Sequence, residues 1–139
     1  MSTYPNDAAG FNQIQKGSLP DFLGIDINMV DANGVHGQLE IKPHHLAPNG
    51  FLHAAAVVAL ADTCCGYGCI AQLPPGAKGF TTIELKSNHL GTATTGAMRC
   101  VATPVHLGRT TQVWDATVQA PDGKIMAMFR CTQMILWPR

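Results

Sequence analysis

The chain has 139 residues, the size of one domain and enough for a hydrophobic core that needs no disulfides or metals. Nine Lys and Arg balance nine Asp and Glu, so the net charge is zero and no basic surface for nucleic acid is indicated. Charged residues make up only 13% of the chain and apolar residues 46%, which excludes general disorder. So few charges also predict that self-association covers part of the surface.

The sequence predicts neither a targeting segment nor a membrane span. The N-terminus lacks the basic and then apolar stretches of a secretory signal, and the five cysteines are an odd number. We therefore expect reduced thiols, buried as free side chains in the core, and a cytoplasmic location. Residues 43–77 form a long, weakly charged stretch, but His, Gly and Pro interrupt it, so it does not fit a membrane span.

Residues 1–18 are polar and rich in Gly and Asn, and we expect them to be loosely ordered. A single domain follows over residues 19–139. It begins with a short helical turn that Gly24 ends and continues with two alternating strands. Between these strands, the run from Asp31 to Gly34 is a hairpin signal.

Residues 53–72 are predicted to form one long, mostly buried helix after a loop. The segment is too long for a strand, is rich in Ala and is followed by a Pro-Pro-Gly stop. Four strands come next, with an edge or bulge at Pro104; their ranges are 82–87, 96–107, 110–120 and 125–137. This element order predicts an α+β domain in which an antiparallel sheet wraps around one central helix.

Asp62 is the only formal charge between residues 43 and 77, and it lies in the middle of the predicted apolar helix. An unpaired buried carboxylate is strongly unfavourable, and Asp is a poor residue inside a helix. In a structural interpretation, Asp62 lies on a solvated stripe or pairs with a buried basic group. In a functional interpretation, it is a general base or nucleophile at the wall of an apolar pocket.

The start of the same helix is a second chemical feature. Its first N–H groups have no partner within the helix, and the helix dipole makes this end electropositive, so it can hold an oxyanion. Asp62 follows His53 by nine residues, which is roughly 13–14 Å along the axis and about 180° around it. Asp62 therefore cannot act on a carbonyl held at the start of its own helix. A site that uses both features lies between two chains.

At these residues the chain resembles the hotdog-fold thioesterases, specifically the PaaI-like acyl-CoA thioesterases related to phenylacetic acid degradation. The family pattern is Gly-x-x-His-Gly-Gly, about six further residues, and then Leu-Ala-Asp-Thr. This sequence has Gly50-Phe51-Leu52-His53-Ala54-Ala55 and then Leu60-Ala61-Asp62-Thr63. The predicted element order also matches the hotdog order, over roughly residues 19–137.

The resemblance implies an enzyme that hydrolyses an aryl- or medium-chain acyl-CoA to the free acid and CoA. Asp62 would attack the thioester or activate water. The N–H of Ala54, placed by His53, would polarise the carbonyl from the opposite subunit. Thr82 stands where relatives carry a Ser or Thr that orients water.

The resemblance also assigns residues that lie further from the motif. Gly108 and Arg109 stand where relatives place a loop near the CoA nucleotide. Relatives often have an Asn six residues before the His; here that position is Ala47, so Asn49, two positions later, is the candidate for the orienting side chain. The implied assembly is a homodimer, or a homotetramer built as a dimer of dimers, with its sites at the subunit interface.

Coenzyme A enters only as part of the substrate, so no cofactor is expected. His44 and His45 could join another His at a metal, but no Cys-x-x-Cys or His-Glu-x-x-His spacing supports one, and we expect none. Two other functions remain open. The alanines at 54 and 55 keep a non-catalytic acyl-CoA-binding or sensing protein in view, and a hotdog hydratase or dehydratase would need an Asp/His pair that this sequence does not show.

Overall fold

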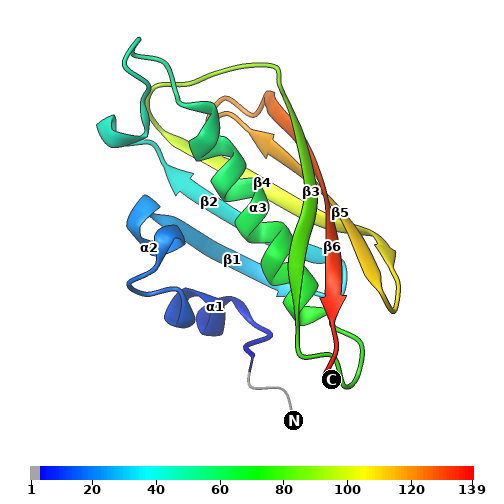
Figure 1. Cartoon of the computed structure of the whole chain (residues 1–139). Coiled ribbons are helices and arrows are strands. Elements are labelled where there is room, and N and C mark those ends of the chain that lie inside the picture. The colour runs from blue at the N-terminus through cyan, green and yellow to red at the C-terminus, as the bar shows by residue number, and fades with distance from the viewer. Residues whose placement is uncertain (1–3) are drawn as a thin grey trace.

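The computed structural model describes residues 4–139, and in it one six-stranded sheet wraps around a long helix (Figure 1). Every pair of neighbouring strands is antiparallel, in the spatial order β1-β2-β4-β5-β6-β3. The strands are β1 (Ile25–Asp31), β2 (Gly34–Glu40), β3 (Gly79–His89), β4 (Ala97–Leu107), β5 (Thr111–Gln119) and β6 (Ile125–Leu136). The predicted α+β hotdog architecture is confirmed.

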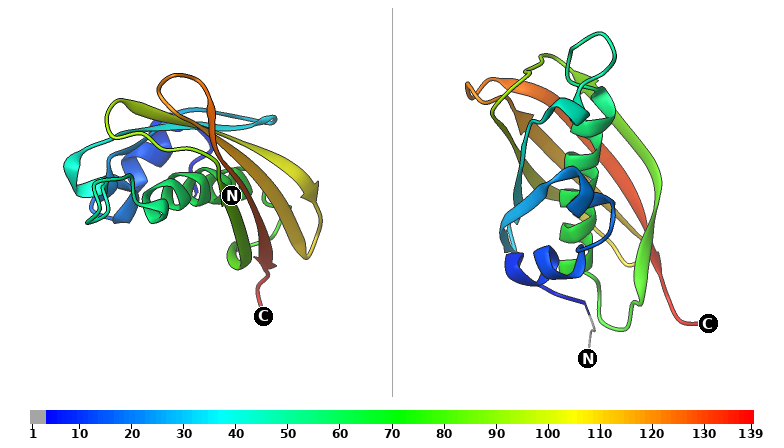
Figure 2. Two further views of the ribbon diagram at one scale, coloured as in Figure 1. Left: turned by 90° about the horizontal axis from the view of Figure 1, so that it is seen from above. Right: turned by 90° about the vertical axis from the view of Figure 1, so that its left-hand side faces the viewer.

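The central helix α3 (Ala54–Ala71) runs across the inner face of the curved sheet (Figure 2). Gly68 lets α3 pack closely against the sheet, because a Cβ atom at this position would lie 2.5 Å from the ring of Trp114 on β5. By length and composition α3 would also fit a membrane span, but half of it is buried inside the molecule. Packing in the core therefore accounts for its apolar sequence. All five cysteines are buried free thiols, as expected.

The turns lie where glycine residues in the sequence predicted them. Gly24 ends the short helix α2 (Leu19–Leu23) with a φ of 84°, a conformation that glycine adopts without strain. The predicted hairpin joins β1 to β2, and at Gly34 a Cβ atom would lie 1.9 Å from the carbonyl oxygen of Ala102 on β4. The register of β4 against β5 shifts beyond Pro104, so the predicted bulge is confirmed.

The expectation of a loosely ordered segment over residues 1–18 is wrong for its described part. Residues Ala8–Ile14 form the helix α1, and Phe11 is completely buried, with its ring stacked on that of Tyr67 at 4.4 Å. The Tyr67 hydroxyl also donates to Gln15 Oε1. One buried aromatic residue anchors a segment whose composition is otherwise polar, and composition alone does not reveal such an anchor. The first three residues lie outside the described part.

Candidate active site

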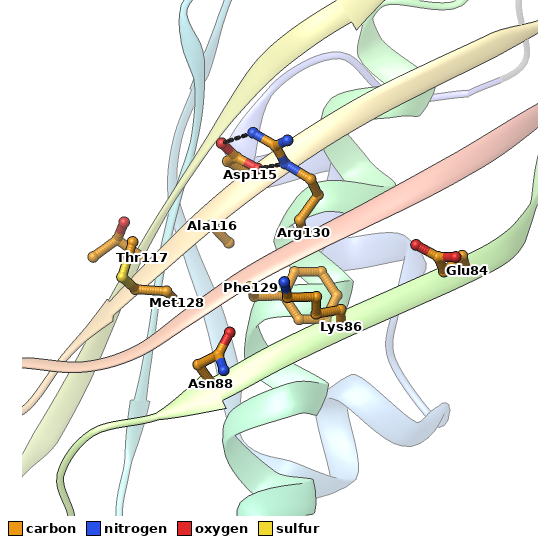
Figure 3. Close-up of a pocket in the computed structure, with 9 residues that line it drawn as sticks. All are labelled: Glu84, Lys86, Asn88, Asp115, Ala116, Thr117, Met128, Phe129 and Arg130. Carbon is orange, nitrogen blue, oxygen red and sulfur yellow. Dashed lines mark hydrogen bonds and ion pairs between the residues drawn. The ribbon is translucent and has the colours of Figure 1, made fainter.

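Asp62 lies in the middle of α3, where its side chain is half-buried. Its Oδ1 atom is buried and has no hydrogen-bond partner among residues 4–139. Burial raises the pKa of the carboxyl group above its ordinary value of 3.8. Within the same described range, the one ion pair joins Arg130 to Asp115 on the outer face of the sheet (Figure 3). An ion pair therefore does not account for Asp62, whose free acceptor can take a proton or a hydrogen bond from water or substrate.

The start of α3 presents one open backbone donor. His53 is the N-cap residue, and its Nδ1 atom accepts the N–H of Ala55 at 3.0 Å. Its carbonyl oxygen accepts the N–H of Ala56, also at 3.0 Å. The remaining first-turn amide, that of Ala54, has no acceptor in the described part of the chain. The helix end therefore offers a single unpaired N–H in the electropositive field of the helix dipole.

Ala54 and Asp62 stand too far apart to act together within one chain. They are eight residues apart on a regular helix, which separates their Cα atoms by about 12 Å along the axis. Each therefore carries an unsatisfied hydrogen-bonding group that the other cannot reach. A reacting carbonyl contacts groups at roughly 3 Å, so a site that uses both needs two chains.

Asn49 lies in the exposed loop before α3. Its Oδ1 atom accepts the N–H of Phe51 at 3.1 Å, which is a local turn contact. The next residue, Gly50, has a φ of 88°, and the Ala47 N–H donates to the Phe51 carbonyl at 2.7 Å. The structure thus shows Asn49 shaping the loop that leads to His53, and its role toward a substrate stays a prediction.

Thr82 lies on the edge strand β3, and a bulge decides which way it faces. Strict alternation of side chains along the predicted strand over residues 82–87 would put Thr82 on the face opposite Ile83, Leu85 and Ser87. The register of β3 against β6 shifts between Thr82 and Glu84, so the alternation breaks there, although Leu85 and Ser87 still share a face. Directly paired residues of an antiparallel sheet share a face. Thr82 pairs with buried Gln133 and Leu85 with buried Cys131, so both point toward α3.

A polar pair on the same strand was not singled out by the sequence. Ser87 Oγ and His89 Nε2 lie 2.9 Å apart. These residues pair with Phe129 and Ala127, which are both buried in the core, so they share the α3 side of the sheet with Thr82. Alternation along residues 85–89 was the signal that could have placed the two side chains together.

Gly108 and Arg109 lie in the hairpin between β4 and β5, near the C-terminal end of α3 (Figure 1). The Arg109 guanidinium stacks over the Trp137 ring at 4.1 Å, and the Trp137 indole donates to the Arg109 carbonyl at 3.0 Å. The β4–β5 hairpin therefore lies at the opposite end of α3 from Ala54. One chain alone therefore does not bring these candidates together, and a contact with the CoA nucleotide stays a prediction.

The outer face of the sheet carries a shallow pocket of about 270 Å³ over β3, β5 and β6 (Figure 3). Charged side chains line it: Glu84, Lys86 and the bidentate Arg130–Asp115 pair. The pocket lies on the opposite face of the sheet from α3. As for metals, residues 4–139 contain no group of three His, Cys, Asp or Glu side chains that could hold an ion.

Comparisons with known proteins agree with this architecture. The family model described as the thioesterase superfamily matches residues 49–127. The 1,4-dihydroxy-2-naphthoyl-CoA hydrolase of Listeria monocytogenes is 30% identical over 114 residues, which cover 82% of this chain and 92% of that protein. The structure of a mutant of thioesterase PA1618 from Pseudomonas aeruginosa is 31% identical, with a TM-score of 0.89 and 94% of each chain covered.

The structure of the PaaI protein from the phenylacetic acid degradation operon of E. coli is similar in fold. Its TM-score is 0.80 at 22% identity, and the match covers 90% of this chain and 88% of that one. The family model spans more than half of the chain and includes both the start of α3 and Asp62. The chain therefore belongs to the thioesterase superfamily and is a thioester hydrolase with the hotdog fold.

Proposed function

We propose that this protein is a cytoplasmic acyl-CoA thioesterase that hydrolyses an aryl- or medium-chain acyl-CoA to the free acid and CoA. The observation that carries the proposal is a pair of unsatisfied hydrogen-bonding groups on α3. These are Oδ1 of Asp62, which has no partner, and the unpaired N–H of Ala54. The substrate class is supported by the naphthoyl-CoA hydrolase from Listeria among the similar proteins and by the fold likeness to PaaI.

The site forms between two chains of a homodimer that pairs through β3. This strand is a free edge of the sheet, and an unpaired edge is a template for a further strand. Ile83 and Leu85 are large apolar side chains that stay 53% and 45% exposed on it. Two-fold pairing would cover them and bring the two α3 helices alongside each other in opposite directions, so that each Asp62 meets the partner's helix start.

A second interface would join two such dimers into a tetramer. The outer face of the sheet leaves Val101, Met128 and Met134 between 38% and 53% exposed. A chain with only 13% charged residues has little else to keep such a surface in water. Burial of this face in a dimer of dimers accounts for both observations.

The chemistry follows from the two open groups. The N–H of Ala54 holds the thioester carbonyl oxygen and stabilises the negative charge that develops on it. The Asp62 carboxylate of the other chain either removes a proton from the attacking water or attacks the carbonyl carbon itself. The C–S bond then breaks, CoA leaves as the thiolate and takes up a proton, and water supplies the oxygen of the free acid. Thr82 and Asn49 would orient the water and the carbonyl, and Arg109 would bind a CoA phosphate.

The test is release of free CoA from a panel of thioesters that includes benzoyl-, phenylacetyl-, octanoyl- and acetyl-CoA. Wild-type protein is expected to release CoA, and Asp62→Asn to lose the activity by at least about 100-fold with its fold and oligomeric state unchanged. Asp26→Asn, which alters an exposed carboxylate on β1, is the matched control. Full activity in Asp62→Asn contradicts the mechanism. Tight binding of acyl-CoA by wild-type protein without CoA release would instead support the non-catalytic alternative.

A further inference from the structure

The two edges of the sheet differ in what lies beside them. β3 is a free edge, whereas the helix α1 lies beside β1, on the side away from β2 (Figure 1). An edge strand presents a row of N–H and C=O groups that can pair with a strand of another chain. β1 has the sequence Ile-Asp-Ile-Asn-Met-Val-Asp. It contains neither Pro nor Lys, which commonly obstruct such pairing, so its own charged side chains that oppose pairing are Asp26 and Asp31.

The side chain of Asn12 on α1 makes both hydrogen bonds that a neighbouring strand would make with Ile27. Its Nδ2 atom donates to the Ile27 carbonyl oxygen at 2.8 Å, and its Oδ1 atom accepts the Ile27 N–H, also at 2.8 Å. Two facing residues of an antiparallel ladder exchange the same pair of bonds. The carboxamide group supplies a donor and an acceptor side by side, so one side chain stands in for a residue of a further strand.

Gln15, also from the N-terminal segment, binds the next outward-facing group of the same strand. Its Nε2 atom donates to the Ile25 carbonyl oxygen at 2.6 Å. Its Oε1 atom accepts the hydroxyl of Tyr67 on α3 at 2.8 Å, which holds the carboxamide from the other side. Gln15 is only 5% exposed, and a buried amide that lost these partners would be left unsatisfied. These bonds therefore hold the N-terminal segment on the edge of the sheet.

Beyond Ile27 the strand itself becomes irregular. The register of β1 against β2 shifts between Ile27 and Met29, and a bulge of this kind bends the strand and interrupts its ladder. The stretch before the bulge, residues 25–27, is the one to which Asn12 and Gln15 bind. The stretch after it, residues 29–31, ends at once in the β1–β2 hairpin. The contacts from the N-terminal segment therefore cover the longer way into the edge, and the bulge shortens what is left.

We propose that α1 closes the β1 edge against strand pairing with a second copy of this chain, through Asn12 and Gln15, and so leaves β3 as the open edge of the six-stranded sheet. Pairing of β3 with β3 about a two-fold axis closes after two chains, whereas pairing of β1 on one chain with β3 on the next can extend into an open-ended assembly. Phe11, which is buried against Tyr67, anchors the helix. The proposal concerns assembly, so it goes beyond the hydrolytic function and does not depend on it.

The test compares the association of variants of the full chain by size-exclusion chromatography with light scattering. Asn12→Ala/Gln15→Ala removes the hydrogen bonds to β1 and is expected to raise the share of species larger than the wild-type assembly by at least about tenfold. Gln13→Ala changes an exposed side chain of the same helix and should behave like wild type. Adding Met29→Lys to the double variant puts a charge at an exposed position of β1 and should suppress the larger species.

Amide hydrogen exchange gives a second readout that does not need the double variant to fold. The Ile27 N–H is expected to exchange at least about tenfold more slowly in wild type than in Asn12→Ala, while the N–H of Val118 on β5 keeps its rate.

Equal exchange of the Ile27 N–H in these two proteins would overturn the proposal. So would a double variant that associates no more than Gln13→Ala. Larger species that persist after Met29→Lys is added would also overturn it, because they would reflect a general loss of stability. Neither readout involves a thioester, so a failure here leaves the proposed function in place.

Discussion

The Nδ1 atom of His53 accepts the N–H of Ala55 at 3.0 Å, and this hydrogen bond decides which amide of α3 is open to a substrate. The His53 carbonyl satisfies the next amide along, that of Ala56. The N–H of Ala54 is left without an acceptor in the described residues. A side chain that caps the helix therefore also selects the amide that is left open at the helix start.

Ala54→Pro should abolish hydrolysis and leave the helix intact. Proline has no N–H and is favoured at the first helical position. His53 has φ −70° and ψ 130°, the extended conformation that a residue before proline needs. We expect a loss of about 100-fold or more in kcat, the usual effect of removing one oxyanion donor, with an unchanged circular dichroism spectrum. Wild-type activity in this variant would show that Ala54 does not hold the carbonyl.

Mixing two inactive variants tests whether the site is shared between chains. When Ala54→Pro and Asp62→Asn protein are unfolded together and refolded, half of the dimers contain one chain of each. Each mixed dimer has one complete site out of two, so about a quarter of the wild-type activity should return. Each variant refolded alone is the control. A mixture as inactive as its components would place the whole site within one chain.

The activity should fall in acid as Asp62 takes up a proton. Burial raises the pKa of this carboxyl group above 3.8, and either mechanism requires the ionised form. We therefore expect the acid limb of kcat/KM against pH to have its midpoint above 3.8. Asp26→Asn should leave that limb in place. A rate that stays flat down to the pKa of an exposed carboxyl group would contradict a role for Asp62 as base or nucleophile.

Asp62→Asn should stabilise the fold at neutral pH. The pKa of Asp62 is raised by burial in the folded protein, so the folded state disfavours the charged form, and stability falls as pH rises through that pKa. The asparagine variant is expected to have a higher Tm at neutral pH, and the difference should shrink in acid as the wild-type carboxyl group becomes protonated. Equal Tm values at every pH would show that Asp62 is not desolvated.

Gly68→Ala should destabilise the protein, because the added Cβ would lie 2.5 Å from the Trp114 ring. Overpacking of this kind typically lowers the free energy of unfolding by about 1–3 kcal/mol. Gly91→Ala is the control, since its Cβ would meet only ordinary contacts, the nearest at 3.8 Å. Urea unfolding of the two variants measures the difference. Equal stability would mean that α3 can move away from β5 without loss.

The buried imidazole of His45 should make the stability of the fold depend on pH in the weakly acidic range. Burial, and secondarily the charges of His44 and Lys42, lower the pKa of His45 below 6.5, against the opposing contact with the Leu23 carbonyl. A lowered pKa favours the neutral ring in the fold, so stability should decline as pH falls below 6.5. Urea unfolding from about pH 8 to about pH 5 measures this slope. His45→Gln should reduce it and His36→Gln should retain it; an unchanged slope in both variants would assign it to other groups.

Much of this fold could be predicted from local pattern alone. Apolar alternation located the strands, an alanine-rich run located α3, and Gly24 and Gly34 marked turns that the backbone then adopts. Asp62 and Ala54 stood out for the same reason. A charge inside an apolar helix and an amide at a helix start can both be recognised from neighbouring residues, without knowing what packs against them.

The tertiary structure decided what depends on segments far apart in the chain. Stacking of Phe11 on Tyr67 orders a polar N-terminal segment, and a bulge between Thr82 and Glu84 puts Thr82 on the same face of β3 as Leu85. The hairpin that carries Arg109 lies at the far end of the helix. Periodicity reports which side chains of one element share a face, whereas a cavity, a register shift or the meeting of two ends depends on contacts between elements. The sequence by itself therefore determined the secondary-structure elements and the two candidate groups on α3, and only the packing between elements decided where these groups lie in the fold.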